Sequence, residues 1–146
     1  MKDFTIIEAE NKEDIHNAYQ IRKEVFINEQ KLFSETDIDE NDIHACCLLA
    51  LHEEAPVGTV RIFSNGKNGN WMGGRLAVKK KYRGFAVGEQ LVKKAVSLAR
   101  EKGATYFSAN IQKPNVPFFK KLNWKEESEP FSINGVLHVK MSVDLY

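Results

Sequence analysis

The chain has 146 residues, of which 42% are hydrophobic and 28% charged, as is typical of one soluble globular domain with a sizeable core. Its 21 basic and 20 acidic residues give a formal net charge of +1, which does not favour nucleic acid as a partner. No apolar run approaches the roughly 18 residues of a membrane span, and the N-terminus lacks the apolar segment of a signal peptide, so we expect a cytoplasmic protein.

The first elements expected along the chain are a strand, a helix and an acidic loop. Residues 4–8 predict a short strand. Asn11 predicts a helix N-cap, and the apolar residues after it recur at helical spacing until about residues 28–30. Residues 35–42 carry five carboxylates in eight positions, so we expect a loop that is too acidic to pack.

The rest of the chain alternates strands and helices. Cys46 and Cys47 are neighbours on a predicted strand and face opposite ways, so we expect two reduced, packed thiols. The order of elements predicts one mixed α/β domain over residues 1–146. The expected elements are a hairpin of strands 45–52 and 57–63 around a turn at 53–56, a strand at 71–78, a helix at 89–102 that stops at Gly103, a strand at 106–111, a short helix from 114, and strands at 124–127 and 136–145 around a turn at 132–135.

A turn of small residues, Arg83-Gly84-Phe85-Ala86-Val87-Gly88, lies between a predicted strand and the strongest predicted helix. Such a turn lets an anion approach backbone N–H groups, and the dipole of the following helix favours negative charge. The spacing does not fit a dinucleotide G-x-G-x-x-G, nor a nucleotide P-loop, because Glu89-Gln90 stands where Lys-Ser/Thr is required. The segment predicts a site for a phosphorylated cofactor, with a nucleotide as the less favoured alternative.

This turn resembles the coenzyme A pyrophosphate loop, Arg-x-x-Gly/Ala-x-Gly, of the GNAT superfamily of acyl-CoA-dependent N-acyltransferases. The segments Pro56–Arg61 and Asn115–Trp124 resemble two further motifs of that family. Arg22–Gln30 and Gly135–Met141 are similar to the "R-x-x-V-F-x-x-E-Q" and "G-x-x-H-x-x-M" segments of a bacterial subgroup. The resemblance implies a single-domain α/β (α+β) GNAT-like fold over residues 1–146, with a central mixed twisted sheet, splayed parallel strands and flanking helices.

The resemblance also implies an activity and a cofactor site. The expected reaction moves an acetyl or other acyl group from acetyl-CoA to a primary amine of a small molecule or peptide by direct attack, without a metal, a membrane or nucleic acid. A non-catalytic acyl-CoA sensor is the alternative, and a homodimer is left open. The residues assigned to coenzyme A are Leu76, Ala77, Val78, Arg83, Gly84, Phe85, Ala86, Val87, Gly88, Glu89, Asn115 and Phe119.

Catalytic residues are less directly implied. Many family members place a Tyr acid where this chain has Phe119, so that role cannot be carried over. Glu29 is a candidate base or amine ligand, or else an exposed carboxylate at a helix end. His138 is a candidate catalytic residue, or else a structural histidine among apolar neighbours. The acidic loop either faces the acceptor and favours a cationic amine or is simply solvated. At Ala86 we expect a negative φ.

Overall fold

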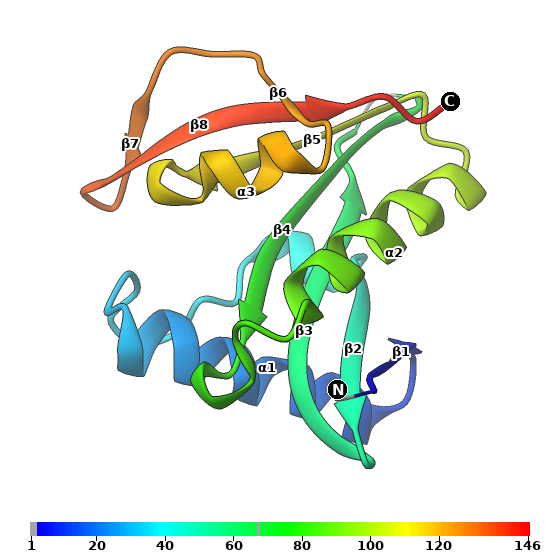
Figure 1. The fold of residues 1–146 in the computed structure, drawn as a ribbon, viewed down its shortest axis with the longest axis vertical. Helices are drawn as coiled ribbons and strands as arrows, with labels where there is room; N and C mark the ends of the chain where they lie inside the picture. Colours follow the sequence, from blue (N-terminus) through cyan, green and yellow to red (C-terminus); the bar gives the residue numbers. More distant parts are fainter. Residues whose placement is uncertain (1–2, 67) are drawn as a thin grey trace.

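The structure is a computed structural model that describes residues 3–66 and 68–146. These residues form one sheet of eight strands in the order β1-β2-β3-β4-β5-β8-β6, with β7 paired to β8 (Figure 1). The strands are β1 (Thr5–Ala9), β2 (Cys46–His52), β3 (Ala55–Ser64), β4 (Asn70–Val78), β5 (Tyr106–Gln112), β6 (Lys125–Glu126), β7 (Phe131–Ile133) and β8 (Val136–Val143), and the α-helices are α1 (Lys12–Arg22), α2 (Val87–Glu101) and α3 (Val116–Lys121). None of the described helices is long and apolar enough to cross a membrane.

Helix α1 begins where the sequence predicts. The Asn11 side chain accepts a hydrogen bond from the Asp14 N–H at 2.8 Å, which caps the helix. The helix continues as a π-helical segment, Lys23–Glu29, so the predicted end near residues 28–30 is confirmed. The sequence pattern did not predict the π-helical geometry, which occurs often at functional sites.

Helix α2 packs closely on the sheet because of one glycine. A Cβ added at Gly58 on β3 would lie 3.0 Å from the Leu91 side chain and 3.2 Å from the Val87 side chain. Either distance is shorter than a side chain tolerates without a shift of its neighbours. Gly58 therefore allows α2 to approach β3, and this contact fixes where the N-terminus of α2 lies.

Strands β4 and β5 run parallel and then part. Their register runs from Asn70 opposite Tyr106 to Gly73 opposite Ala109, and it stops there. Beyond that point β4 keeps its antiparallel partner β3, after a bulge at which Arg75 adopts a φ of 54°. Residues 74–78 of β4 therefore have no strand partner on the β5 side within the described chain, as expected from splayed parallel strands.

Three local predictions are corrected by the structure. The turn between β2 and β3 is shorter than expected, since only Glu53 and Glu54 turn, with φ of 50° and 70°. Likewise only Asn134 and Gly135 turn between β7 and β8, with φ of 50° and 81°. Two-residue hairpin turns of this hand need positive φ at both positions. Strand β7 is absent from the sequence prediction, because two of its three residues, Ser132 and Ile133, lie in the predicted turn.

The acidic loop is the third correction, because it packs. Asp37 is only 3% exposed, and residues Glu40–Ile43 form a 3-10 helix capped by the Asp39 side chain. The prediction of a loop too acidic to pack was wrong, since its carboxylates meet arginines that are distant in the sequence.

Each face of the sheet has its own apolar core. Helix α1 covers one face, and its core includes Ile21, Val25 and Leu49. Helices α2 and α3 pack over the other face, where the core is larger and rich in aromatic residues. Cys47 is buried and Cys46 half-buried, both as free thiols, and burial raises the pKa of each.

Candidate functional site

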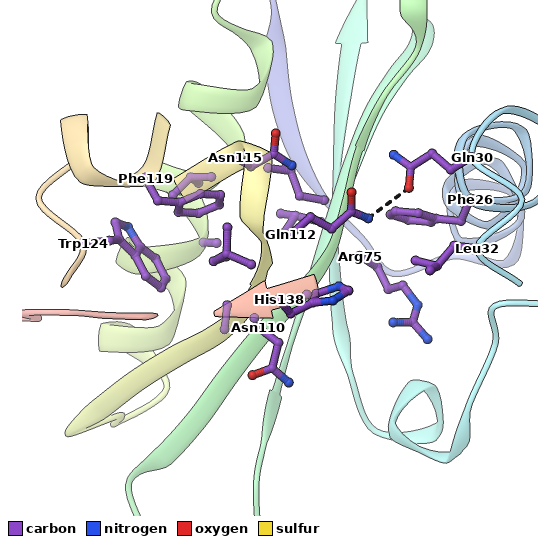
Figure 2. Close-up of a pocket in the computed structure, with 18 of the residues that line it drawn as sticks. Phe26, Gln30, Leu32, Arg75, Asn110, Gln112, Asn115, Phe119, Trp124 and His138 are labelled. Carbon is purple, nitrogen blue, oxygen red and sulfur yellow. Dashed lines mark hydrogen bonds between the residues drawn. The ribbon is translucent and has the colours of Figure 1, made fainter. Parts of the chain in front are cut away.

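A cavity of about 130 Å³ lies where β4 and β5 part (Figure 2). Its lining comes from both cores, which means that it passes between the two strands from one face of the sheet to the other. On the α1 face it is lined by Phe26, Gln30, Leu32, Phe33 and Arg75, and on the α2 and α3 face by Val92, Ala95, Phe107, Phe119 and Trp124. The parted strands supply Gly73, Gly74, Ala109, Asn110, Ile111 and Gln112.

The predicted anion loop leads directly into α2. Within the described chain, no side chain caps the N-terminus of this helix, so its first N–H groups point outward unsatisfied by a cap. Gly84 has a φ of 89°, which favours glycine. At Gly88 a Cβ would meet the Phe118 ring at 3.6 Å, an ordinary contact. Packing within the protein therefore does not require a glycine at position 88.

Ala86, the N-cap residue of α2, contradicts its predicted conformation. We expected a negative φ, but the structure gives φ 66° and ψ 16°, in the left-handed region. That conformation costs a non-glycine residue about 1 kcal/mol. The chain adopts it because the turn after β4 must reverse direction before α2 can pack against Gly58.

Arg83 connects the anion loop to the end of the π-helical segment. Its Nη1 and Nη2 donate to the Glu29 carboxylate at 2.6 and 2.7 Å, and its Nε donates to the Val78 carbonyl at 2.9 Å. The hydrogen bonds from Arg83 lower the pKa of Glu29. The structure thus brings Glu29 to the predicted cofactor loop, and Glu29 is absent from the described lining of the cavity.

His138 lies in the wall of the cavity. It sits opposite Gln112 in the pairing of β5 with β8 and is 5% exposed. Its Nδ1 is 2.8 Å from the Val136 carbonyl oxygen. A carbonyl can only accept, so Nδ1 carries a proton, and Nε2 is the ring nitrogen left to exchange a proton with a bound molecule.

The predicted cofactor residues of the C-terminal half line the opposite wall. Phe119 packs edge-on against Trp124, with ring centroids 5.3 Å apart, and Asn115 lies one helical turn before it (Figure 2). Leu76 lines the cavity, and Ala77 and Val78 continue the edge of β4 that has no partner on β5. The structure therefore places Leu76, Asn115 and Phe119 in the lining of one cavity, whereas Ala77, Val78 and the loop residues Arg83–Glu89 are absent from its described lining.

Six buried or half-buried charges, which we call the charge cluster, support the α1 side of the cavity. Arg22 donates to Asp37 at 2.6 Å and to both oxygens of Asp42 at 2.8 and 2.9 Å. Arg61 donates to both oxygens of Asp39 at 2.7 and 2.9 Å. Arg75 donates twice to the Asp37 carbonyl, at 3.2 and 2.8 Å. The members of the charge cluster are Arg22, Asp37, Asp39, Asp42, Arg61 and Arg75.

The charge cluster changes the acidity of its members. Burial by itself raises the pKa of Asp42, but hydrogen bonds from Arg22, from the Asp39 N–H and from Arg61 bring it down to about 2. Hydrogen bonds to Asp42 and Asp37 raise the pKa of Arg22 despite its burial. Sequence reasoning missed this cluster. The available signal was Arg22 itself, a charged residue at a core position of the predicted helix.

Two hydrogen bonds join the walls of the cavity. The Gln112 amide donates to the Gln30 side-chain oxygen at 3.0 Å, drawn as the dashed line in Figure 2. Asn134, in the turn between β7 and β8, donates to the Leu32 carbonyl at 3.2 Å. Gln30, Gln112 and Asn110 were not singled out from the sequence as site residues, because polar amides carry no distinctive spacing.

Comparisons with known proteins agree with this arrangement. Residues 8–145 match the family model described as an acetyltransferase (GNAT) domain. The uncharacterized N-acetyltransferase YjcF of Bacillus subtilis (strain 168) is 34% identical over 137 residues, which cover 93% of this chain and 96% of YjcF. No group of three or more His, Cys, Asp or Glu side chains among residues 3–66 and 68–146 is arranged to hold a metal ion.

Two solved structures share the fold. An acyl-CoA N-acyltransferase from Pseudomonas aeruginosa superposes with a TM-score of 0.84 at 21% identity, over 98% of this chain and 99% of that one. An aminoglycoside 6'-N-acetyltransferase complexed with coenzyme A has a TM-score of 0.79 at 12% identity, over 97% of each chain. At such identities the likeness concerns the fold alone.

Proposed function

The chain belongs to the GNAT acetyltransferase family, and from this premise we propose that it transfers an acetyl or other acyl group from acyl-CoA to a primary amine. One observation carries the proposal. An open edge of β4 and a buried histidine lie at a single cavity that passes through the sheet. The N-terminus of α2, which no side chain caps within the described chain, follows shortly after that strand edge. The acceptor would be a small molecule or a peptide. A cytoplasmic location and a homodimer stay predictions.

Coenzyme A fits the residues on the α2 side of this cavity. The backbone of Leu76, Ala77 and Val78 lies on the edge of β4 that has no β5 partner in the described chain, where it would face the amides of the pantetheine arm. The N–H groups from Arg83 to Glu89, with the α2 dipole, would hold the pyrophosphate. Asn115 and Phe119 would line the passage of the arm. When bound, acyl-CoA supplies the thioester, and the protein supplies position and proton transfer.

His138 is our candidate for the general base. Its Nδ1–H is held by the Val136 carbonyl, so Nε2 is oriented and free to accept a proton from the acceptor ammonium. Glu29 suits that role less, because its hydrogen bonds with Arg83 lower its pKa and hold it at the loop. We propose that Glu29 positions Arg83 for the pyrophosphate.

Phe119 has no proton to donate, so the thiolate would leave unassisted or be protonated by another group. The comparisons do not support a non-catalytic acyl-CoA sensor, which was the alternative expected from this substitution.

The test measures release of free thiol from acetyl-CoA with a panel of amines. Replacing His138 by Gln should lower kcat about 100-fold or more, while calorimetry shows unchanged affinity for coenzyme A. His16→Gln, on the exposed side of α1, is the matched control and should retain the wild-type rate. Binding of coenzyme A without thiol release with any amine would contradict the proposed function. A wild-type rate in His138→Gln would refute only the role of His138.

A further inference from the structure

The described lining of the cavity includes neither Asp nor Glu, so an acceptor ammonium would find no ion-pair partner among these residues. The lining does include one permanent cation and a set of neutral hydrogen-bonding groups. The polar lining residues are Gln30, Arg75, Asn110, Gln112, Asn115 and His138.

The acidic loop does not supply the missing carboxylate. Asp37, Asp39 and Asp42 are each bound to arginines of the charge cluster. The other two acids of the loop, Glu35 and Glu40, are exposed and lie outside the described lining. A cationic amine would have to break the charge cluster to reach Asp37, Asp39 or Asp42. The idea that the loop selects a cationic acceptor therefore loses its physical basis.

Arg75 differs from the other two arginines of the charge cluster. Its side chain is 19% exposed, against 1% for Arg22 and 5% for Arg61. Arg22 and Arg61 each bind both oxygens of a carboxylate at 2.9 Å or less, whereas the shortest bond of Arg75 goes to the Asp37 backbone carbonyl. The nearest carboxylate oxygens are 3.2 and 3.3 Å from Arg75. Arg75 is thus the arginine whose charge is least completely paired.

The position of Arg75 is also fixed. Its guanidinium stacks over the Phe33 ring at 4.6 Å, and it projects from the bulge of β4, next to Leu76. Its Nη1 makes no hydrogen bond with the described residues. Burial and the charges of Arg61 and Arg22 lower the pKa of Arg75, although the charges of Asp37 and Asp39 raise it. In the view of Figure 2, Arg75 lies between Leu32 and His138.

From these observations we propose that the acceptor is an anionic amine, whose carboxylate or phosphate group binds Arg75 while its amino group is presented to His138. This inference rests on the proposed acyl transfer and names its substrate class. An arginine binds either anion through charge-assisted hydrogen bonds. The absence of a lining carboxylate then avoids repulsion of the anion, and the neutral amides of the cavity complete its hydrogen bonding.

The first experiment uses wild-type protein saturated with coenzyme A and isothermal titration calorimetry. The probes are β-alanine and O-phosphoethanolamine, their neutral-group counterparts β-alaninamide and ethanolamine, and the dication 1,3-diaminopropane. We expect at least one anionic amine to bind about tenfold or more tightly than its counterpart, and the better of the two identifies carboxylate or phosphate. Equal or tighter binding of the neutral-group amines or the diamine overturns the inference, as does a lack of binding by both anionic amines.

A second experiment locates the anion. Arg75→Gln should remove the anionic preference, and Arg75→Lys should retain part of it because the charge remains. The matched control is Arg100→Gln, on the exposed side of α2, which should keep the full preference. Affinity for coenzyme A, measured for each variant, verifies an intact fold. An anionic preference that survives in Arg75→Gln contradicts the assignment to Arg75.

The design separates this inference from the proposed function. Calorimetry detects anion recognition whether or not the amine is acylated. Thiol release with all amines, but without preference for the anionic ones, would overturn the inference and leave acyl transfer standing. Preferential binding of anionic amines without any thiol release would support the inference and contradict the proposed acyl transfer.

Discussion

The two faces of the sheet form the same cavity by different means. On the α1 face the wall depends on the charge cluster, in which three arginines hold three aspartates. On the α2 and α3 face it depends on packed aromatic rings, including Phe107, Phe119 and Trp124, with centroid separations of 5.3 to 5.6 Å. Hydrogen bonds between charged groups are directional and depend on protonation, whereas ring packing depends on shape and volume.

This difference predicts different functions for the walls. An aromatic wall can accommodate the apolar parts of a long cofactor arm without a fixed charge. A wall of charge-assisted bonds fixes single atoms, such as those of the Arg75 guanidinium, within a region of low exposure. A buried ion pair adds little net stability, because desolvation opposes the attraction, but removal of one partner is costly. The walls should therefore respond differently to substitution and to pH.

The largest expected effect comes from breaking the charged wall. Arg22→Met leaves Asp37 and Asp42 buried without their main partner, so the free energy of unfolding should fall by about 4 kcal/mol. Urea denaturation at pH 7 measures it. Arg100→Met, at an exposed position where the guanidinium stacks on the Tyr146 ring, should cost no more than about 1 kcal/mol. Equal free energies of unfolding for the two variants would show that the charge cluster does not stabilise the α1 side of the cavity.

The aromatic wall should respond less strongly. Trp124→Ala is expected to cost about 3 kcal/mol, at the lower end for a buried tryptophan because Trp124 already borders a cavity. Urea denaturation at pH 7 and pH 4 should give the same difference from wild type, because Trp124 does not titrate. A difference that changed strongly between these pH values would mean that the two walls are coupled.

Acid should weaken the charged wall alone. The pKa of Asp42 is about 2 in the fold against an ordinary value of 3.8. This lowered pKa contributes about 2 kcal/mol to the free energy of unfolding. The contribution is fully present above pH 5 and is lost as the pH falls through 4 towards 2. Urea denaturation between pH 6 and pH 2 should show this decline, and Arg22→Met should flatten it. An unchanged decline in Arg22→Met would assign it to other carboxylates.

The smallest expected effect comes from the turn between β4 and α2, which belongs to neither wall. It gives a reference against which the effects in the two walls can be compared. Ala86→Gly relieves a left-handed alanine and should stabilise the protein by about 1 kcal/mol at every pH. Gly84→Ala places a side chain at φ 89° and should cost about as much. Thermal midpoints of both variants measure the effects. Destabilisation by Ala86→Gly would mean that the methyl group makes contacts worth more than the strain.

Local sequence signals were sufficient for the order of elements except β7, and for a turn of small residues between β4 and α2. Asn11 caps α1 through the residue three positions later, and Gly103 ends α2 with a φ of 90°. The small residues from Gly84 to Gly88 predicted the turn that leads into α2, although the helix begins at Val87 and not at Glu89. Such signals act within one or two turns of chain, so the sequence by itself determined them.

Only the tertiary structure decided what surrounds the loop and the cavity. Arg22 meets an aspartate 15 positions away, Arg75 one 38 positions away, and Arg83 a glutamate 54 positions away. The same constraint gave Ala86 its left-handed φ, because α2 must reach Gly58 from the end of β4. A charged residue has many suitable partners along the chain. The packing of α1, the acidic loop and β4 decides which of them become neighbours. Only neighbours in space can offset the cost of burying a charge.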